Sequence, residues 1–101
     1  MRDPNETLSL LKTKIEEIEA LKAKENDSKL AQWQAEVKMI LEKLLGDESK
    51  YFHQFDNISY LPHVWNEENK HQRLNEAYVD GLDEAKAILT AVVFGIEQKL
   101  I

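Results

Sequence analysis

Apolar side chains recur every three or four residues along three separate stretches of this 101-residue chain. The clearest series consists of Leu30, Trp33, Val37, Ile40, Leu41, Leu44 and Leu45. This spacing puts the whole series on one face of an α-helix. Gly46 follows, and glycine is favoured just past a helix end because it takes a positive φ without a Cβ clash. The sequence therefore predicts a helix that starts from a cap at Asp27 or Ser28 and ends at Gly46.

A second series, nearer the N-terminus, has spacings of four and three: Leu8, Leu11, Ile15, Ile18 and Leu21. Asp3 can cap this helix and Pro4 suits its first position. The charged residues Lys12, Glu16, Glu19 and Lys22 are spaced to pair along its wet face. The series covers under three heptads, fewer than a coiled coil needs. We expect the stripe to pack within the chain, with a dimer seam as the alternative.

The third series predicts a long last helix from near Asn66 to about Leu100. Its apolar positions are Leu74, Tyr78, Leu82, Ala85, Ile88, Leu89, Val92, Val93 and Ile96. Gly81 marks either a kink or a close approach by a neighbouring element. Val93 and Phe94 widen the stripe beyond one face, so this end is either the centre of the core or packs on another chain.

Five of the chain's eight aromatic residues lie between the second and third series: Tyr51, Phe52, Phe55, Tyr60 and Trp65. Residues 49–55 are long enough for two helical turns, and Pro62 blocks any continuation. Because buried aromatic rings dominate local packing energy, this segment is expected to fold back and cover one end of the helices.

These patterns define the expected fold. No stretch alternates at period two, so no sheet is predicted. We expect an all-α protein: a small bundle of three main helices, with a short helix and an aromatic loop before the long last helix, forming a single domain over residues 1–101.

Charge and composition narrow the function classes. The formal net charge is −6, and the 13 basic residues are interleaved with 19 acidic ones. No basic stripe is available for phosphate, so neither nucleic acid nor an anionic membrane is an expected partner. The chain has no cysteine, which excludes disulfides and thiolate sites. No secretory signal is visible at the N-terminus, and a cytoplasmic location is expected.

Few residues suggest chemistry. His63, Glu67 and His71 are spaced i, i+4, i+8, and Glu68 with His71 forms one Glu-x-x-His. A di-iron bundle needs a second such motif, and Pro62 separates His63 from the helix. His53 lies among aromatic residues with no nucleophile context. Two groups of carboxylates sit on polar helix faces: Glu16, Glu17 and Glu19, and Asp80, Asp83 and Glu84. We therefore expect no catalytic site, no metal and no cofactor.

The order of several motifs is similar to a known family. They are residues 33–37 (Trp-Gln-Ala-Glu-Val), 40–49 (Ile-Leu-Glu-Lys-Leu-Leu-Gly-Asp-Glu-Ser), 55–59 (Phe-Asp-Asn-Ile-Ser) and 77–89, which contains Gly81. Together they resemble a helical module of uncharacterised bacterial, archaeal and phage proteins, found alone or ahead of another domain such as a TIR-related nucleotide-binding domain. The resemblance spans roughly residues 8–97.

The resemblance implies no catalytic residues. It implies that Trp33, Gly46, Phe55 and Gly81 are framework positions, and that the module is an accessory to an effector domain. The helical pattern is still running at Ile101, so the chain is expected to be a stand-alone version or a truncated piece.

The function expected from these observations is a non-enzymatic protein-interaction or oligomerisation module. Its candidate surface is Trp65, Val93, Phe94 and Leu100, and its partner is a second copy in a homodimer, an effector domain or another protein. A first alternative is a small-ligand sensor with a pocket near residues 51–65, beside the last helix. A second alternative is a metal-dependent enzyme that uses Glu67, Glu68 and His71.

Overall fold

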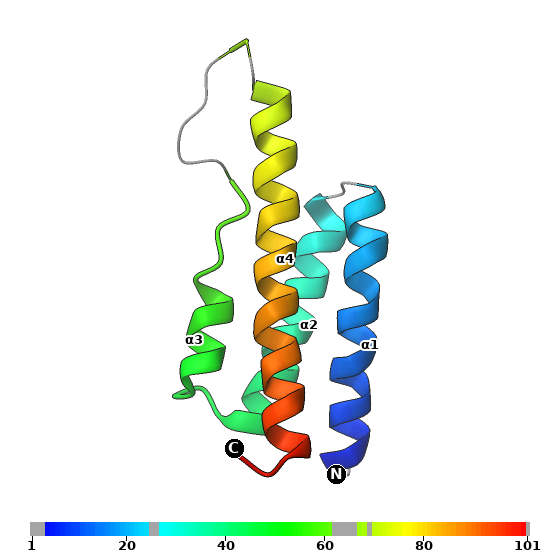
Figure 1. Cartoon of the computed structure of the whole chain (residues 1–101), viewed down its shortest axis with the longest axis vertical. Coiled ribbons are helices and arrows are strands. Elements are labelled where there is room, and N and C mark those ends of the chain that lie inside the picture. Colours follow the sequence, from blue (N-terminus) through cyan, green and yellow to red (C-terminus); the bar gives the residue numbers. More distant parts are fainter. Residues whose placement is uncertain (1–3, 25–26, 62–66, 69, 101) are drawn as a thin grey trace.

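The all-α prediction is confirmed by the computed structural model, which describes residues 4–24, 27–61, 67–68 and 70–100. Within those residues it contains four helices and no strand (Figure 1). The helices are α1 (Pro4–Ala23), α2 (Asp27–Leu45), α3 (Lys50–Asp56) and α4 (Lys70–Glu97). Three long helices and one short one are the elements that the apolar spacing predicts.

The helices pack in a square. Among the described residues, α1 and α3 each contact both α2 and α4, whereas α2 and α4 do not approach each other closely. Successive helices run antiparallel, and the first turns of α4 extend past the ends of α1 and α2 (Figure 1). The arrangement is that of an up-down-up-down four-helix bundle in which the third helix has only 7 residues.

The core forms where the apolar stripes of the three long helices meet. Its fully buried large side chains are Leu11, Ile18, Val37, Leu41, Leu82, Leu89 and Val92. The apolar stripe of α1 packs inside the chain, which confirms the predicted intramolecular packing of this helix. Trp33 is 4% exposed and Phe55 2%, and their ring centroids lie 5.7 Å apart. This contact fixes α3 against α2.

The turn between α2 and α3 has the conformation that the sequence predicts. Gly46 has φ 86° and its N–H donates to the Glu42 carbonyl at 2.9 Å. Ser49 then caps α3, where its side chain accepts a hydrogen bond from the Tyr51 N–H at 3.2 Å. The predicted glycine stop and the two predicted helical turns are both confirmed.

The predicted bounds of α4 are wrong at both ends. The helix starts at Lys70, not near Asn66, and Glu67 and Glu68 form a turn before it. Since Leu74 is the first apolar residue of the predicted series, earlier turns would bury nothing. At the other end the helix stops at Glu97, and Lys99 takes φ 58° where the sequence predicts continued helix.

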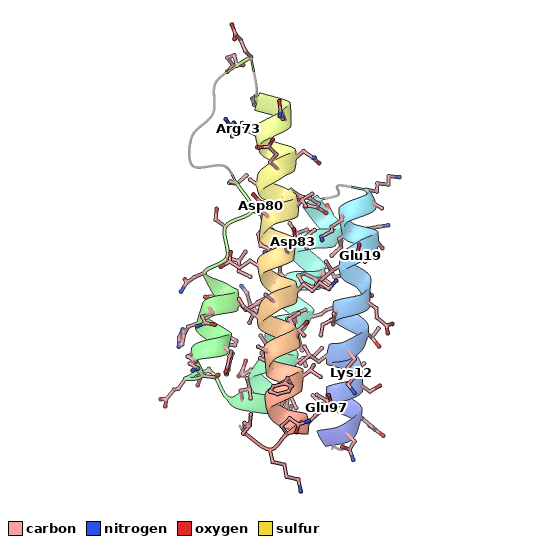
Figure 2. All side chains as sticks on the ribbon, viewed as in Figure 1. Lys12, Glu19, Arg73, Asp80, Asp83 and Glu97 are labelled. Atoms are coloured by element: carbon pink, nitrogen blue, oxygen red, sulfur yellow. The ribbon has the colours of Figure 1, made fainter. Side chains whose placement is uncertain are left out.

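Three of the four α1 residues expected to pair along that helix, Lys12, Glu19 and Lys22, pair with α4 instead. Lys12 lies 2.8 Å from Glu97 (Figure 2). Lys86 lies 3.5 Å from Glu19, and Lys22 pairs with Asp83. The spacing within α1 suggests pairs along one helix, but α4 runs antiparallel beside it and presents the opposite charges. Each exposed pair contributes little energy, and the ladder of three favours one register of α1 against α4.

The chain after α3 runs along the side of the bundle. Ile58 is buried, and the Tyr60 ring lies on Gly81 in α4. A Cβ atom added to Gly81 would lie 2.9 Å from Cε1 and 3.0 Å from Cγ of this ring, and closer still to Cδ1. Of the two predicted roles of Gly81, the close approach is confirmed. In the described residues this segment lies along the side of the bundle, so the prediction that it covers one end of the helices is wrong. The reason is that α3 is short and leaves the side between α2 and α4 uncovered beyond its end.

We expect Gly81→Ala to destabilise the fold by about 1–3 kcal/mol through the clash with the Tyr60 ring. The sign of this change in stability identifies the clash, because alanine in a helix is otherwise favoured over glycine by about 1 kcal/mol. Urea unfolding of the single and double variants checks this. In a Tyr60→Ala background, Gly81→Ala should be neutral or stabilising; an equal loss in both backgrounds would contradict the contact.

Candidate binding site

A cavity of about 620 Å³ opens between α2, α4 and the segment 57–61. Its walls come from both long helices and from that segment: Leu30, Gln34, Asn57, Ile58, Ser59, Tyr60, Leu61, Leu74 and Tyr78. The cavity follows from the shortness of α3. Beyond Asp56 the third corner of the square holds an irregular chain, which is thinner than a helix about 10 Å across and leaves part of the corner unfilled.

The described cavity walls are uncharged and carry several polar groups. Two of these groups are already used. The Ser59 hydroxyl donates to the Leu61 carbonyl at 3.1 Å and accepts from the Leu61 N–H at 3.3 Å. The Tyr78 hydroxyl is buried and donates to the Leu21 carbonyl of α1 at 2.8 Å. The amides of Gln34 and Asn57 and the hydroxyl of Tyr60 are the other polar groups of these walls.

Tyr60 is the distinctive group. Its ring is half-buried against Gly81, and its hydroxyl oxygen is shielded from solvent without a hydrogen-bond partner in the part of the chain that the structure describes. Burial raises the pKa of Tyr60 to about 12, the negative charge of Glu84 adds to the rise, and the nearby Gln34 amide opposes it. Gln34 thus acts on the hydroxyl without a hydrogen bond of ordinary geometry. At neutral pH the hydroxyl is protonated and is a donor.

A smaller groove of about 340 Å³ lies between α1 and α2 beside Trp33. Here the Trp33 Nε1–H donates to the Lys14 carbonyl at 3.1 Å, and Lys14 Nζ lies 2.6 Å from Glu36 and 3.1 Å from Glu17. Burial alone would lower the pKa of Lys14, but the bonds to Glu36 and Glu17 outweigh it and raise it. These contacts join the two helices, and Trp33 belongs to the core, as its periodicity predicts.

The residues of the predicted interaction surface are not all exposed in the structure. Val93 is 9% exposed and packs in the core, so it has to be removed from that surface. Phe94 comes one residue later, which turns it about 100° around the helix, and it is 58% exposed. Leu100 is 72% exposed and follows the end of α4. Trp65 lies outside the described residues.

The candidates for metal or catalytic chemistry are not brought together. Glu67 and Glu68 are exposed in their turn, while His63 and the side chain of His71 fall outside what the structure describes. No three described His, Asp or Glu residues are grouped so that they would hold a metal. His53 is exposed and meets the edge of the Phe52 ring, with centroids 5.8 Å apart. The two predicted acidic groups are exposed on helix faces.

The alternative prediction of a pocket near residues 51–65 points to the right part of the chain, since residues 57–61 line the cavity. Four lining residues lie outside the segment that the sequence suggests, namely Leu30, Gln34, Leu74 and Tyr78, and Gln34 and Leu74 illustrate why. Leu74 belongs to an apolar stripe and is assigned to the core, and Gln34 is one of several amides on α2. Neither carries a local signal, because the cavity depends on which elements become neighbours.

The comparisons with known proteins give no relative: no family model, no curated protein and no solved structure matches this chain. The resemblance to the helical module stays a prediction. The four framework positions that it implies do have structural roles: Trp33 and Phe55 are buried in contact, Gly46 has a positive φ, and Gly81 accommodates Tyr60. Among the described helices, none is long and apolar enough to cross a membrane.

The raised pKa of Tyr60 makes stability depend on alkaline pH. The unfolded chain releases this proton near its usual pKa of about 10, whereas the folded chain holds it to about 12. The ionisation of Tyr60 therefore leaves the unfolding free energy unchanged below about pH 10. The unfolding free energy then falls as the pH rises towards 12. We expect the wild type to lose more unfolding free energy than Tyr60→Phe between pH 9 and pH 11, as measured by urea denaturation. Parallel losses would contradict the burial of this hydroxyl.

Proposed function

We propose that this chain is a non-enzymatic binding module and that its ligand site is the cavity between α2, α4 and the 57–61 segment. The observation that carries the proposal is about 620 Å³ of space lined by residues of both long helices and of the 57–61 segment. Ligand sites in proteins commonly measure about 300–1,000 Å³, are mainly apolar and hold a few polar groups. We place the protein in the cytoplasm and give it no cofactor as part of the same proposal.

The packing supports binding at the cavity over binding at the outer helix faces. The apolar stripes of α1, α2 and α4 are largely buried against one another, so little of them is left for a partner. The large exposed apolar side chains in the described residues are Met39, Leu61, Phe94 and Leu100. Single exposed apolar residues are common on protein surfaces and do not by themselves mark a binding site.

Filling the cavity tests this function. Leu74→Trp adds an indole in the cavity wall, and Ala87→Trp adds the same group at an exposed position of α4 away from that wall. We expect small neutral compounds from a fragment library to raise the Tm of the wild type and of Ala87→Trp in thermal-shift assays. The same compounds should have no effect on Leu74→Trp. If every hit also stabilised Leu74→Trp, or if no compound stabilised the wild type, the cavity would not be the site.

A second candidate function is the predicted protein-interaction or oligomerisation module. The specific observation in its favour is that Phe94, in the last turn of α4, is 58% exposed and that Leu100, just after this helix, is 72% exposed. A second copy of this chain, or an effector domain of the kind that the resemblance implies, would cover these side chains through apolar contacts.

Phe94→Asp tests the second function, with Met39→Asp as its matched control, because Met39 is an exposed apolar residue on a different helix. If the wild type self-associates through this end, we expect light scattering over a range of concentrations to show a dimer or larger assembly. Phe94→Asp should then be a monomer with unchanged helical content, and Met39→Asp should associate as the wild type does. A wild type that is monomeric at every concentration would exclude self-association.

A further inference from the structure

The 57–61 segment forms one side of the cavity between α2 and α4. We propose that this segment is a strap that moves away from α4 and back while the four helices stay folded, and that the shielded hydroxyl of Tyr60 lowers the stability of the closed state. The opening regulates access to the cavity. This regulatory role rests on the proposed function, whereas the motion itself depends on no ligand.

The hydrogen bonds of this segment are local. The Ile58 N–H donates to the Phe55 carbonyl at 3.2 Å, and the Leu61 N–H donates to the Ser59 hydroxyl at 3.3 Å. In the part of the chain that the structure describes, no hydrogen bond of ordinary geometry joins residues 58–61 to α2 or α4. A segment that lacks such bonds opens at a lower free energy than the helices around it.

Two side chains hold the segment against the bundle. Ile58 is 9% exposed and belongs to the core, and the Tyr60 ring packs on Gly81. Beside these two contacts lies the cavity of about 620 Å³, so part of the segment packs against no side chain. The preceding helix stays in place, because Phe55 packs on Trp33. The bend that opens the segment therefore falls after α3.

The Tyr60 hydroxyl opposes closure. Its oxygen is shielded from solvent without a hydrogen-bond partner among the described residues, and the Gln34 amide acts on it without a bond of ordinary geometry. When the segment leaves α4, water binds the hydroxyl and this loss is recovered. A phenylalanine ring would pack on Gly81 without the loss. The hydroxyl therefore shifts the equilibrium towards the open state by about 5- to 150-fold.

Thiol labelling tests the strap, because the chain has no cysteine and one introduced thiol reports on one site. Ile58→Cys puts the thiol in the segment, and Val92→Cys puts it in α4 at a fully buried position. Each full-length variant is reacted with dithionitrobenzoate over a range of urea concentrations below the unfolding transition. The reagent is kept where the rate is proportional to its concentration, so that the rate measures the equilibrium exposure of the thiol.

We expect Ile58→Cys to react faster than Val92→Cys and its rate to rise little with urea, because a local opening exposes little surface. Val92→Cys should follow the urea slope of global unfolding. Adding Tyr60→Phe to Ile58→Cys should slow the labelling about 5- to 150-fold. Adding Tyr51→Phe should leave it unchanged, since Tyr51 is a half-buried tyrosine outside the cavity walls. Both tyrosine variants share the Ile58→Cys background, so the lost isoleucine contacts cancel.

Two results would overturn the inference. If Ile58→Cys has the same urea slope as Val92→Cys, the segment leaves α4 only when the whole chain unfolds, and there is no strap. If the opening is local but Tyr60→Phe does not slow it, the role assigned to the hydroxyl is wrong. Neither result involves a ligand, so the proposed function still stands or falls on the thermal-shift comparison. A failure of that comparison would leave the motion in place and remove only its regulatory role.

Discussion

The bundle depends on the two elements that bridge α2 and α4. In the described structure these two helices lie at diagonal corners and do not approach each other closely. The core is therefore covered only if another element packs between them on each side. On one flank α1 does so with a full-length stripe in which Leu11 and Ile18 are entirely buried. On the other flank α3 provides only 7 residues. The asymmetry between a 20-residue bridge and a 7-residue bridge determines the rest of the molecule.

The short bridge is completed by three contacts in succession. Phe55 packs on Trp33 and joins α3 to α2, Ile58 enters the core, and Tyr60 reaches Gly81 on α4. Irregular chain contacts its neighbours at separate points and not along a continuous face. The space between these points is the cavity, and Tyr60, whose ring packs on Gly81, is one of the residues that line it. One local fact, the end of α3 at Asp56, therefore accounts for both the fold's irregularity and its candidate site.

Much of the fold was predictable because helix formation leaves a local signal. The apolar spacing identifies the core face of each long helix, and Gly46 marks a turn that needs a positive φ. What was missed depends on neighbours far apart in sequence. Lys12, Glu19 and Lys22 pair with α4, which no spacing within α1 reveals. Val93 and Phe94 are equally apolar, yet only the position of the core decides which one is buried. The cavity is non-local for the same reason.

Tyr60 shows why the site and the fold are hard to separate. The ring is needed to cover Gly81 and to close the flank, and phenylalanine would do that equally well. The hydroxyl adds nothing to this packing, and shielding it without a hydrogen-bond partner in the described residues opposes folding by about 1–3 kcal/mol. A structural role therefore explains the ring and leaves the oxygen unexplained. Tyr60→Phe keeps the ring on Gly81 and removes the hydroxyl, so it separates the packing of the ring from the chemistry of the oxygen.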